Sequence, residues 1–427
     1  MKINVYGSTL AAWVAAACLA KMGNDVCLQE RRVGQKKIRL ENLSNISVIR
    51  DEPGLREQIN QQVESGRLNR VKRTELAEVD VHWLAHEPND QLLAEKIINA
   101  IAVKGAKKSL VINQGNFEVG ATAALQAKHS EECPDVLFAY IPDNLEQGNA
   151  LNGFLQSKRI TIGADTNKAI MAAKGLLRPF CQDVEHMQIM SSKEAEFTKF
   201  ATTGMLAIRL GYINELANLA DQLDVDIDVI REGMGGDPRI GRHYLSPGCG
   251  FGGQNFHAYI SKFSEIFEAK GEQSLLKTVL DENEVQKELL FRKLWQHYES
   301  DLIDKKVVIW GASFKAGTAS IDNAPSLRVI DALLSQGVEV NIYDPEALDN
   351  LLARYGTEAG VFYHTNMYQA AQECDALLLM TEWPEFLSPD YKSLHDVMNQ
   401  PLIIDGRNVF DKAILEAEGF DYIGVGR

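Results

Sequence analysis

The stretch Ile3-Asn4-Val5-Tyr6-Gly7-Ser8-Thr9-Leu10-Ala11-Ala12, near the start of the printed sequence, decides the fold. A short apolar strand candidate is followed by a glycine turn and then by an apolar run to Met22 that is typical of a buried helix. Asp25–Gln29 predicts a second strand directly after this helix. A strand, a glycine turn, a helix and another strand indicate a doubly wound, mostly parallel sheet.

The turn after the first strand resembles part of a dinucleotide-binding fingerprint, Gly-x-Gly-x-x-Gly/Ala. In that pattern the second glycine lets a pyrophosphate touch the backbone at the helix N-terminus. Gly7 and Ala12 fit, but Thr9 places a branched Cβ where the pyrophosphate should lie. Glu30 follows the second strand and could accept both ribose hydroxyls. The sequence therefore predicts a partial cofactor site of Gly7, Thr9, Leu10, Ala12 and Glu30, with a plain turn as the alternative.

The alternation of strands and helices continues along the first part of the chain, gives way to helices in the middle, and then starts again. Further strands are expected within 81–85, 109–113, 136–141 and 159–163. A long amphipathic helix is expected over Glu194–Leu223, and a second helical stretch over about 256–300 with an interruption near Gly271. The α/β pattern restarts at Val307-Val308-Ile309-Trp310-Gly311. We predict an α/β chain with two Rossmann-like, doubly wound parallel-sheet domains, residues 1–190 and 301–427, joined by a central helical region at 191–300.

Composition excludes several classes of protein. The 427 residues include 44 basic and 59 acidic side chains, and a net charge of −15 opposes binding to nucleic acid or to an anionic membrane. The apolar run 10–20 is too short to span a bilayer. Six cysteines without paired spacing give no disulfide or metal pattern and fit a reducing cytoplasm. They are Cys18, Cys27, Cys133, Cys181, Cys249 and Cys374.

Two glycine-rich segments in the middle of the chain carry a specific resemblance. Asp237-Pro238-Arg239-Ile240-Gly241 and Pro247-Gly248-Cys249-Gly250-Phe251-Gly252-Gly253 resemble the UDP-glucose/GDP-mannose dehydrogenase family. Other segments resemble signatures of that family in the same order, so the resemblance covers essentially the whole chain. These segments are Glu52–Leu55, Pro142–Ala150, Phe314–Lys315, Ala324–Leu327, Tyr343–Pro345, Thr381–Trp383 and Asp405–Asn408.

The resemblance implies an N-terminal NAD-binding domain, a central helix that forms a homodimer, and a C-terminal domain that holds a nucleotide sugar. It implies oxidation of a sugar alcohol to a carboxylate by two hydride transfers to NAD, through a thioester on a cysteine. Carried over residue by residue, the catalytic set is Lys199, Asp143, Thr203 and Asn255. The substrate-binding set is Leu145, Arg239, Tyr244, Ser246, Phe251, Gly252, Lys315 and Arg407.

The sequence departs from the family at the positions that carry the chemistry. Asn255 stands where the family has its nucleophilic cysteine, and an amide nitrogen cannot form a thioester. Ala258 and Tyr259 replace a lysine and an aspartate, and Thr203 replaces an asparagine. Further departures are Asp143 for a glutamate, Gln114–Phe117 for Ser-Thr-Val-Pro, and Asp322 for an arginine. The sequence therefore resembles the family in the segments that form the fold and departs from it at the residues that carry out the reaction.

Three functions follow as alternatives. The first is a catalytically impaired relative that binds a nucleotide sugar such as UDP-glucose. The second is an active NAD-dependent dehydrogenase with an atypical site, and the third is a structural dimer with both ligand sites empty.

Single residues also leave alternatives open. Cys249 is either a relocated nucleophile or an ordinary loop residue, and His257 is either a general base or a partly exposed loop histidine. Lys199 either polarises a sugar oxygen or pairs with a carboxylate. Packing is favoured over ligand contact at Trp383, and a core position over metal binding at His82 and His86.

Overall fold

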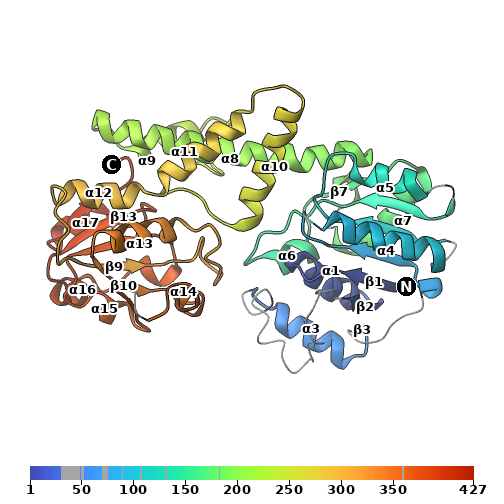
Figure 1. The fold of residues 1–427 in the computed structure, drawn as a ribbon, viewed down its shortest axis with the longest axis horizontal. Coiled ribbons are helices and arrows are strands. Elements are labelled where there is room, and N and C mark those ends of the chain that lie inside the picture. Colours follow the sequence, from blue (N-terminus) through green and yellow to red (C-terminus); the bar gives the residue numbers. More distant parts are fainter. Residues whose placement is uncertain are drawn as a thin grey trace. The chain divides into compact units, whose positions relative to one another are not determined.

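The computed structural model describes residues 1–29, 49, 52–69, 76–88, 90–105, 108–129, 131, 133–181, 183–357 and 360–427. It divides the chain into two compact units, Met1–Ala201 and Thr202–Arg427, each built around one sheet (Figure 1). The expected domain boundaries at 190 and 300 stay a prediction. In the described part of the chain, every helix is too short or too polar to cross a bilayer.

The first unit contains an eight-stranded sheet in the order β3-β2-β1-β4-β5-β6-β7-β8. All neighbours are parallel except β6 and β7, which meet antiparallel where Tyr140 pairs with Gly163. The sequence missed β3, which has two residues, and β8, in which only Met187 is buried. The strands are β1 (Lys2–Tyr6), β2 (Asp25–Gln29), β3 (Leu68–Asn69), β4 (Val81–Leu84), β5 (Leu110–Asn113), β6 (Leu137–Tyr140), β7 (Ile160–Gly163) and β8 (Met187–Met190).

Helix α1 (Leu10–Lys21) is the buried helix that the sequence predicts. Every residue from Ala11 to Ala20 is buried, because α1 packs against the sheet on one side and against α3 and α6 on the other. Its small alanine side chains allow this close packing on several sides. The other helices of the unit are α3 (Leu55–Glu64), α4 (Gln91–Lys104), α5 (Ala121–His129), α6 (Ala150–Leu155) and α7 (Asn167–Leu177).

The central part of the chain is helical, as expected. Helix α8 (Ser192–Leu223) is the long helix, and the division between the two units falls within it. The second helical stretch is interrupted at Gly271, whose φ of 78° ends a helix in a left-handed conformation. A further break, which the sequence did not predict, separates the last two helices. The helices are α9 (Ile227–Gly235), α10 (Gln254–Ala269), α11 (Leu275–Gln286) and α12 (Leu289–His297).

The second unit contains a six-stranded, fully parallel sheet in the order β11-β10-β9-β12-β13-β14. The predicted α/β class, with two parallel-sheet domains and a long central helix, is confirmed. The strands are β9 (Lys306–Trp310), β10 (Glu339–Tyr343), β11 (Val361–Tyr363), β12 (Ala376–Leu379), β13 (Leu402–Asp405) and β14 (Asp421–Ile423). The helices are α13 (Pro325–Ser335), α14 (Leu348–Tyr355), α15 (Met367–Ala370), α16 (Tyr391–Val397) and α17 (Lys412–Ala417).

Candidate functional site

The turn between β1 and α1 is closed by its own side chains. Gly7 has a φ of 140°, and a Cβ on it would lie 2.1 Å from the carbonyl oxygen of Ala85, so the position requires glycine. Thr9 is the N-cap of α1: its Oγ1 accepts from the Ala12 N–H at 3.1 Å and donates to the Ala85 carbonyl at 2.9 Å. Leu10 begins the helix and packs at the edge of the core. Glu30 lies outside the described residues.

Asp143 and Lys199 form a coupled pair in the first unit. Asp143 follows β6, and its Oδ1 accepts from the Leu145 N–H at 3.1 Å. Burial raises the pKa of the Asp143 carboxyl, and the positive charge of Lys199 opposes that shift. Burial lowers the pKa of the Lys199 ammonium, and Asp143 opposes it in turn. The effect of each charge on the pKa of the other favours the interpretation that Lys199 pairs with a carboxylate.

Two buried glutamates hold this region in place, and the sequence reasoning assigned neither of them. Glu196 accepts from the Gly120 N–H at 2.5 Å and from the Thr122 N–H and hydroxyl at 2.9 and 2.7 Å. It therefore anchors the beginning of α8 at the N-terminus of α5, where a carboxylate is favoured. These partners lie 74 to 76 positions away in the sequence, so no local spacing indicates this role of Glu196.

The second buried glutamate, Glu52, holds the segment after Asp143. Its carboxylate accepts from the N–H groups of Gly148 at 2.7 Å and Ala150 at 2.6 Å, at the beginning of α6. Glu52 is 2% exposed, and these bonds to N–H groups satisfy its buried charge. The segment that resembles the family at Glu52–Leu55 thus packs on the segment that resembles it at Pro142–Ala150.

In the second unit, buried amide side chains fix the glycine loop Gly248–Gly253. The side chain of Asn283 accepts from the Phe251 N–H at 2.8 Å and donates to the Phe251 carbonyl at 3.0 Å. Asn214 accepts from the Gly248 N–H at 2.9 Å, and Gln286 donates to the Gly248 carbonyl at 2.7 Å. The loop is therefore preorganised by helices α8 and α11 rather than by a ligand.

Close packing explains the glycines of this loop. A Cβ on Gly252 would lie 2.7 Å from the Asn323 carbonyl oxygen. A Cβ on Gly250 would lie 3.1 Å from Cγ of Lys287, which is fully buried and bonds to Asn323 at 2.7 Å and Glu284 at 2.6 Å. Burial lowers the pKa of Lys287, and Glu284 opposes that shift.

The residue that the family resemblance aligns with a cysteine, Asn255, lies directly after the glycine loop. Asn255 is exposed in the first turn of α10, directly after the loop. Cys249 is fully buried, with its Sγ 3.8 Å from the Met380 carbonyl oxygen, and burial raises the pKa of its thiol. His257 is partly buried, and burial together with the charge of Lys287 lowers its pKa. Burial and a raised pKa both argue against Cys249 as a relocated nucleophile.

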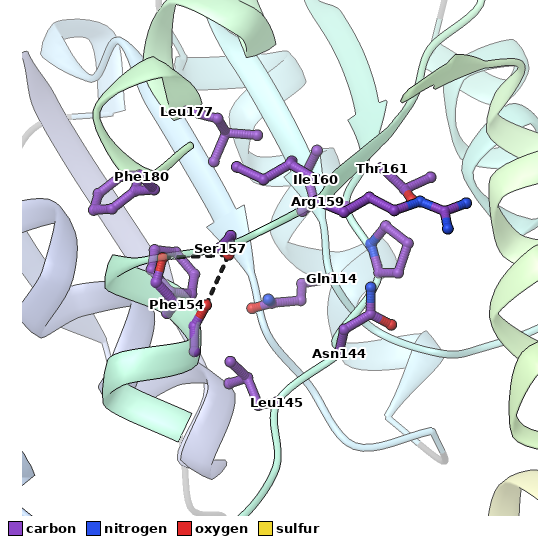
Figure 2. A pocket seen from close by; sticks show the side chains of 13 residues that line it. Gln114, Asn144, Leu145, Phe154, Ser157, Arg159, Ile160, Thr161, Leu177 and Phe180 are labelled. Carbon is purple, nitrogen blue, oxygen red and sulfur yellow. Dashed lines mark hydrogen bonds between the residues drawn. The ribbon is translucent and has the colours of Figure 1, made fainter. Parts of the chain in front are cut away.

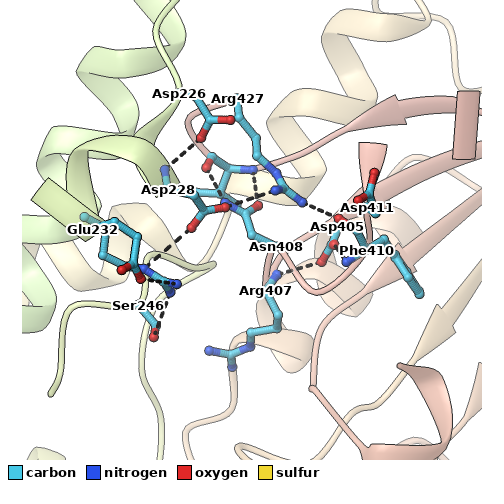
Figure 3. Close-up of polar contacts among 12 residues, drawn as sticks. Asp226, Asp228, Glu232, Ser246, Asp405, Arg407, Asn408, Phe410, Asp411 and Arg427 are labelled. Carbon is cyan, nitrogen blue, oxygen red and sulfur yellow. Dashed lines mark hydrogen bonds and ion pairs between the residues drawn. The ribbon is translucent and has the colours of Figure 1, made fainter. Parts of the chain in front are cut away.

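Arg407 lies beside Gly248 of the glycine loop, and Figure 3 shows its bond to Asp405. Its Nε donates to the Met380 carbonyl at 2.8 Å and lies 3.1 Å from Glu382, and its backbone N–H donates to the buried Asp405 carboxylate at 2.9 Å. A Cβ on Gly248 would lie 3.3 Å from Nη1 of Arg407. In the described part of the chain neither terminal nitrogen of Arg407 has a hydrogen bond, which leaves both N–H₂ groups for an acceptor.

Three family models match the chain in order. They are those of the UDP-glucose/GDP-mannose dehydrogenase family for its NAD binding domain at residues 1–181, its central domain at 193–285 and its UDP binding domain at 308–412. The chain belongs to this UDP-glucose/GDP-mannose dehydrogenase family.

Relatives of known name agree with the family models. A UDP-glucose 6-dehydrogenase of Pseudomonas aeruginosa is 33% identical over all of this chain and 98% of its own length. The UDP-glucose 6-dehydrogenase TuaD of Bacillus subtilis is 29% identical over all of this chain and 93% of its own. The solved structure of a UDP-glucose dehydrogenase from Pyrobaculum islandicum has a TM-score of 0.86 and 26% identity, covering 100% of this chain and 97% of that one.

The other residues predicted to bind substrate lie in the loop before the glycine loop or after strand β9. Arg239 is 87% exposed at its side chain and pairs with Asp237 at 2.6 Å, while Tyr244 is exposed at a φ of 57°. Ser246 accepts from Arg231 at 3.4 Å. Lys315 lies 5.9 Å from the centre of the Phe314 ring, which packs against Gly252 and Gly253. Thr203 is 6% exposed and is the second residue of the second unit, on α8.

Arg209 is a further residue of this loop region that sequence reasoning missed. From α8 it donates to three backbone carbonyls, those of His243, Ile240 and Gly241, each at 2.9 Å. One guanidinium therefore fixes the turn that follows Arg239. An arginine inside an amphipathic helix gives no signal for this in a single sequence.

At Trp383 and His82 the structure favours packing over contact with a ligand or a metal. Trp383 is 8% exposed and donates from Nε1 to the Ser313 hydroxyl and to Asp344, both at 3.2 Å. His82 is fully buried, and its Nδ1 lies 3.0 Å from the Tyr6 hydroxyl. Burial lowers the pKa of His82 to about 4. These contacts favour core positions for Trp383 and His82.

Proposed function

We propose that this chain binds a nucleotide sugar of the UDP-glucose class and does not complete the oxidation of its family. The observation that carries the proposal is Asn255 in the first turn of α10, after a glycine loop that keeps its packing. The lone pair of an amide nitrogen is delocalised, so Asn255 cannot form the thiohemiacetal or the thioester. Cys249 is buried against Met380 and does not replace it.

Retained binding is supported by the second unit alone. Arg407 offers two N–H₂ groups beside Gly248, and such a pair suits a diphosphate or a sugar hydroxyl. The amides of Asn214, Asn283 and Gln286 hold the loop without a ligand, so little ordering is required when one binds. Relatives that cover this whole chain carry the name UDP-glucose 6-dehydrogenase, which suggests the sugar to test first.

Weak NAD binding is part of the same proposal. The family places a pyrophosphate at the N-terminus of the first helix, where backbone N–H groups hold it. In this chain the Thr9 hydroxyl takes the Ala12 N–H, and its bond to Ala85 fixes the side chain across the turn. The turn therefore does not fit the family's way of holding the dinucleotide, and we assign no hydride transfer to it.

We also propose a homodimer through α8. Met205, Tyr212, Leu219 and Leu223 are 58, 51, 47 and 61% exposed, and their spacing places them on one side of the helix. A row of large apolar side chains on one helix face is typical of a protein interface. Light scattering of the chain and of Tyr212→Glu tests this, and a monomer in both would contradict it. The cytoplasmic location expected from the cysteines stays a prediction.

The deciding experiment uses the full chain, UDP-glucose and NAD. Calorimetry with each ligand separately should give a clear isotherm for UDP-glucose and a weak or absent one for NAD. With both ligands present, NADH absorbance should stay at the blank rate, and Arg407→Met should remove the UDP-glucose isotherm. Sustained NADH production would refute the impairment, and no UDP-glucose binding would favour the structural dimer.

A second candidate is an active dehydrogenase with an atypical site, and the Asp143–Lys199 pair favours it. Burial shifts the pKa of each toward the other, a pattern found at catalytic sites as well as in structural pairs. This candidate predicts turnover that Lys199→Met abolishes. Turnover that survives Lys199→Met, or no turnover in the unaltered chain, would remove it.

A further inference from the structure

A hollow lies in the first unit beside α6 and β7 (Figure 2). Its cavity volume is about 60 Å³, and it is partly open to solvent. Phe154, Phe180 and Leu177 form an apolar side, and Figure 2 shows Arg159 and Asn144 on the opposite side. Asp143 is not among the residues that line it, although its neighbours Pro142 and Asn144 are.

Gln114 supplies a fixed hydrogen-bond donor to this hollow. The residue is 4% exposed, and its Oε1 accepts from the indole N–H of Trp83 at 2.8 Å. Because an indole can only donate, this bond fixes which end of the amide is oxygen and leaves the N–H₂ group for another partner. In the part of the chain that the structure describes, that N–H₂ group has no hydrogen bond. Gln114 lines the hollow, so an acceptor that enters it can take this donor.

Charge at the hollow indicates the sign of that acceptor. Arg159 lies at its polar side, where its guanidinium donates to the side chain of Gln188. None of the described lining residues is acidic. Thr161 is 7% exposed and has no hydrogen bond to its hydroxyl among the described residues. The Ser157 hydroxyl is already used, because it donates to the Gly153 carbonyl at 2.8 Å.

We propose that this hollow binds a small carboxylate that carries a short apolar chain or ring. The carboxylate accepts from the Gln114 N–H₂ group and from Arg159, and the apolar part lies against Phe154, Phe180 and Leu177. Apolar walls with a few convergent donors are typical of a small-molecule site. Leu145 lines the hollow and also belongs to the expected nucleotide-sugar set, so the two sites adjoin there.

The test titrates the full chain with benzoate and with butyrate, by calorimetry and by saturation-transfer NMR. Benzylamine and benzamide serve as cationic and neutral probes of similar shape. At least one carboxylate should bind, and benzylamine should not. Benzamide should bind at least about fivefold more weakly than benzoate, because it lacks the charge that faces Arg159.

Variants assign the binding to these residues. Gln114→Glu keeps the oxygen that faces Trp83 and turns the donor into an acceptor, so it should weaken carboxylate binding at least about tenfold. Arg159→Gln should weaken it by about fivefold or more. Lys158→Gln is the matched control, because Lys158 is an exposed neighbour that does not line the hollow. It should leave the affinity unchanged, and thermal melts confirm that each variant folds.

Four results would overturn the inference. They are no binding of either carboxylate, benzylamine binding as tightly as benzoate, equal losses in the Arg159 and Lys158 variants, or displacement of benzoate by UDP-glucose. The last would make the hollow a subsite of the nucleotide-sugar site, so the proposed function would stand while this inference failed. If the chain binds a carboxylate but does not bind UDP-glucose, the proposed function fails and this inference stands.

Discussion

The Thr9 hydroxyl should stabilise the first unit and, by the same two hydrogen bonds, exclude a pyrophosphate. Thr9→Val keeps the branched shape and removes the hydroxyl, and Thr9→Ser keeps the hydroxyl and removes the methyl group. Thr9→Gly removes both and restores the glycine of the dinucleotide pattern. These three changes separate the bulk of the side chain from its hydrogen bonds.

The expected stability changes follow from the contacts. Loss of an N-cap bond such as the one to the Ala12 N–H costs about 1 kcal/mol, and loss of the bond to the Ala85 carbonyl costs about 1 kcal/mol more. Thr9→Val should therefore lower the free energy of unfolding of the unit by about 2 kcal/mol. Thr9→Ser should change it by less than about 0.5 kcal/mol. Thr9→Gly should lie between, at about 1 to 1.5 kcal/mol, because glycine is itself a tolerated N-cap.

The expected affinity changes run in the opposite order. Thr9→Gly frees the Ala12 N–H and removes the Cβ, and one recovered hydrogen bond to a phosphate corresponds to at least about tenfold in the dissociation constant for NAD. Thr9→Ser should bind NAD as weakly as the unaltered chain, since its hydroxyl still caps the helix. Thr9→Val frees the N–H but keeps the bulk, so it distinguishes steric exclusion from competition for the donor.

Urea unfolding followed by tryptophan fluorescence measures the first effect, because Trp13 and Trp83 are buried in this unit. Calorimetry with NAD measures the second. Two results would refute the reasoning. If Thr9→Val is as stable as Thr9→Ser, the hydroxyl does not hold the turn. If Thr9→Gly binds NAD no more tightly than the unaltered chain, the cap is not what limits the cofactor.

Three further predictions concern other residues. Burial lowers the pKa of His82 to about 4 in the folded chain, whereas the pKa of histidine in the unfolded chain is near 6.5. The free energy of unfolding is therefore unaffected by His82 above pH 6.5 and falls as the pH decreases from 6.5 toward 4. Urea unfolding at pH 7 and pH 5 should differ by about 2 kcal/mol from this residue, and His82→Gln should reduce that difference. Arg209→Gln frees three carbonyls of the loop after Arg239 and should weaken UDP-glucose binding about tenfold at a nearly unchanged melting temperature; unchanged affinity would contradict the positioning role. Asn255→Cys should react with maleimide faster than any native cysteine but should not restore NADH production; full turnover would show that this one substitution explains the impairment.

The strands and the long helix could be predicted from the sequence because each has a strong local pattern. The stretch 11–20 is apolar without interruption and is buried along its whole length, and the stretch 110–112 is a short apolar run inside a parallel sheet. Leu68–Asn69 was missed because a two-residue edge strand has no periodicity. Met187–Met190 was missed because only part of it is buried.

The site residues stay a prediction from the family resemblance, and the residues that support them were not predicted. Family resemblance pointed to Asp143 and Arg407 because they stand in recognisable motifs. The residues that position them, such as Glu52, Glu196 and Asn283, act across 32 to 98 positions of sequence. Their role depends on which backbone N–H groups the fold brings to them, and one sequence does not encode that pairing in any local spacing. Thr9 was predicted as a steric obstacle, and its role as a helix cap required the geometry of Ala12 and Ala85.

The contrast between a retained scaffold and altered chemistry has a physical basis in burial. Asn283 is 3% exposed and satisfies both polar groups of Phe251, so its replacement leaves buried groups without partners and costs stability whether or not the chain catalyses a reaction. Asn255 is exposed, and a change there costs the fold almost nothing. The requirement to fold is therefore enough to retain the glycine loop, and its presence is not evidence of activity. Asn283→Ala should lower stability and UDP-glucose affinity together, whereas Asn255→Ala should change neither. Residue 255 would affect binding only if it touches the ligand, and an affinity loss confined to Asn255→Ala would show that its amide has become a binding group.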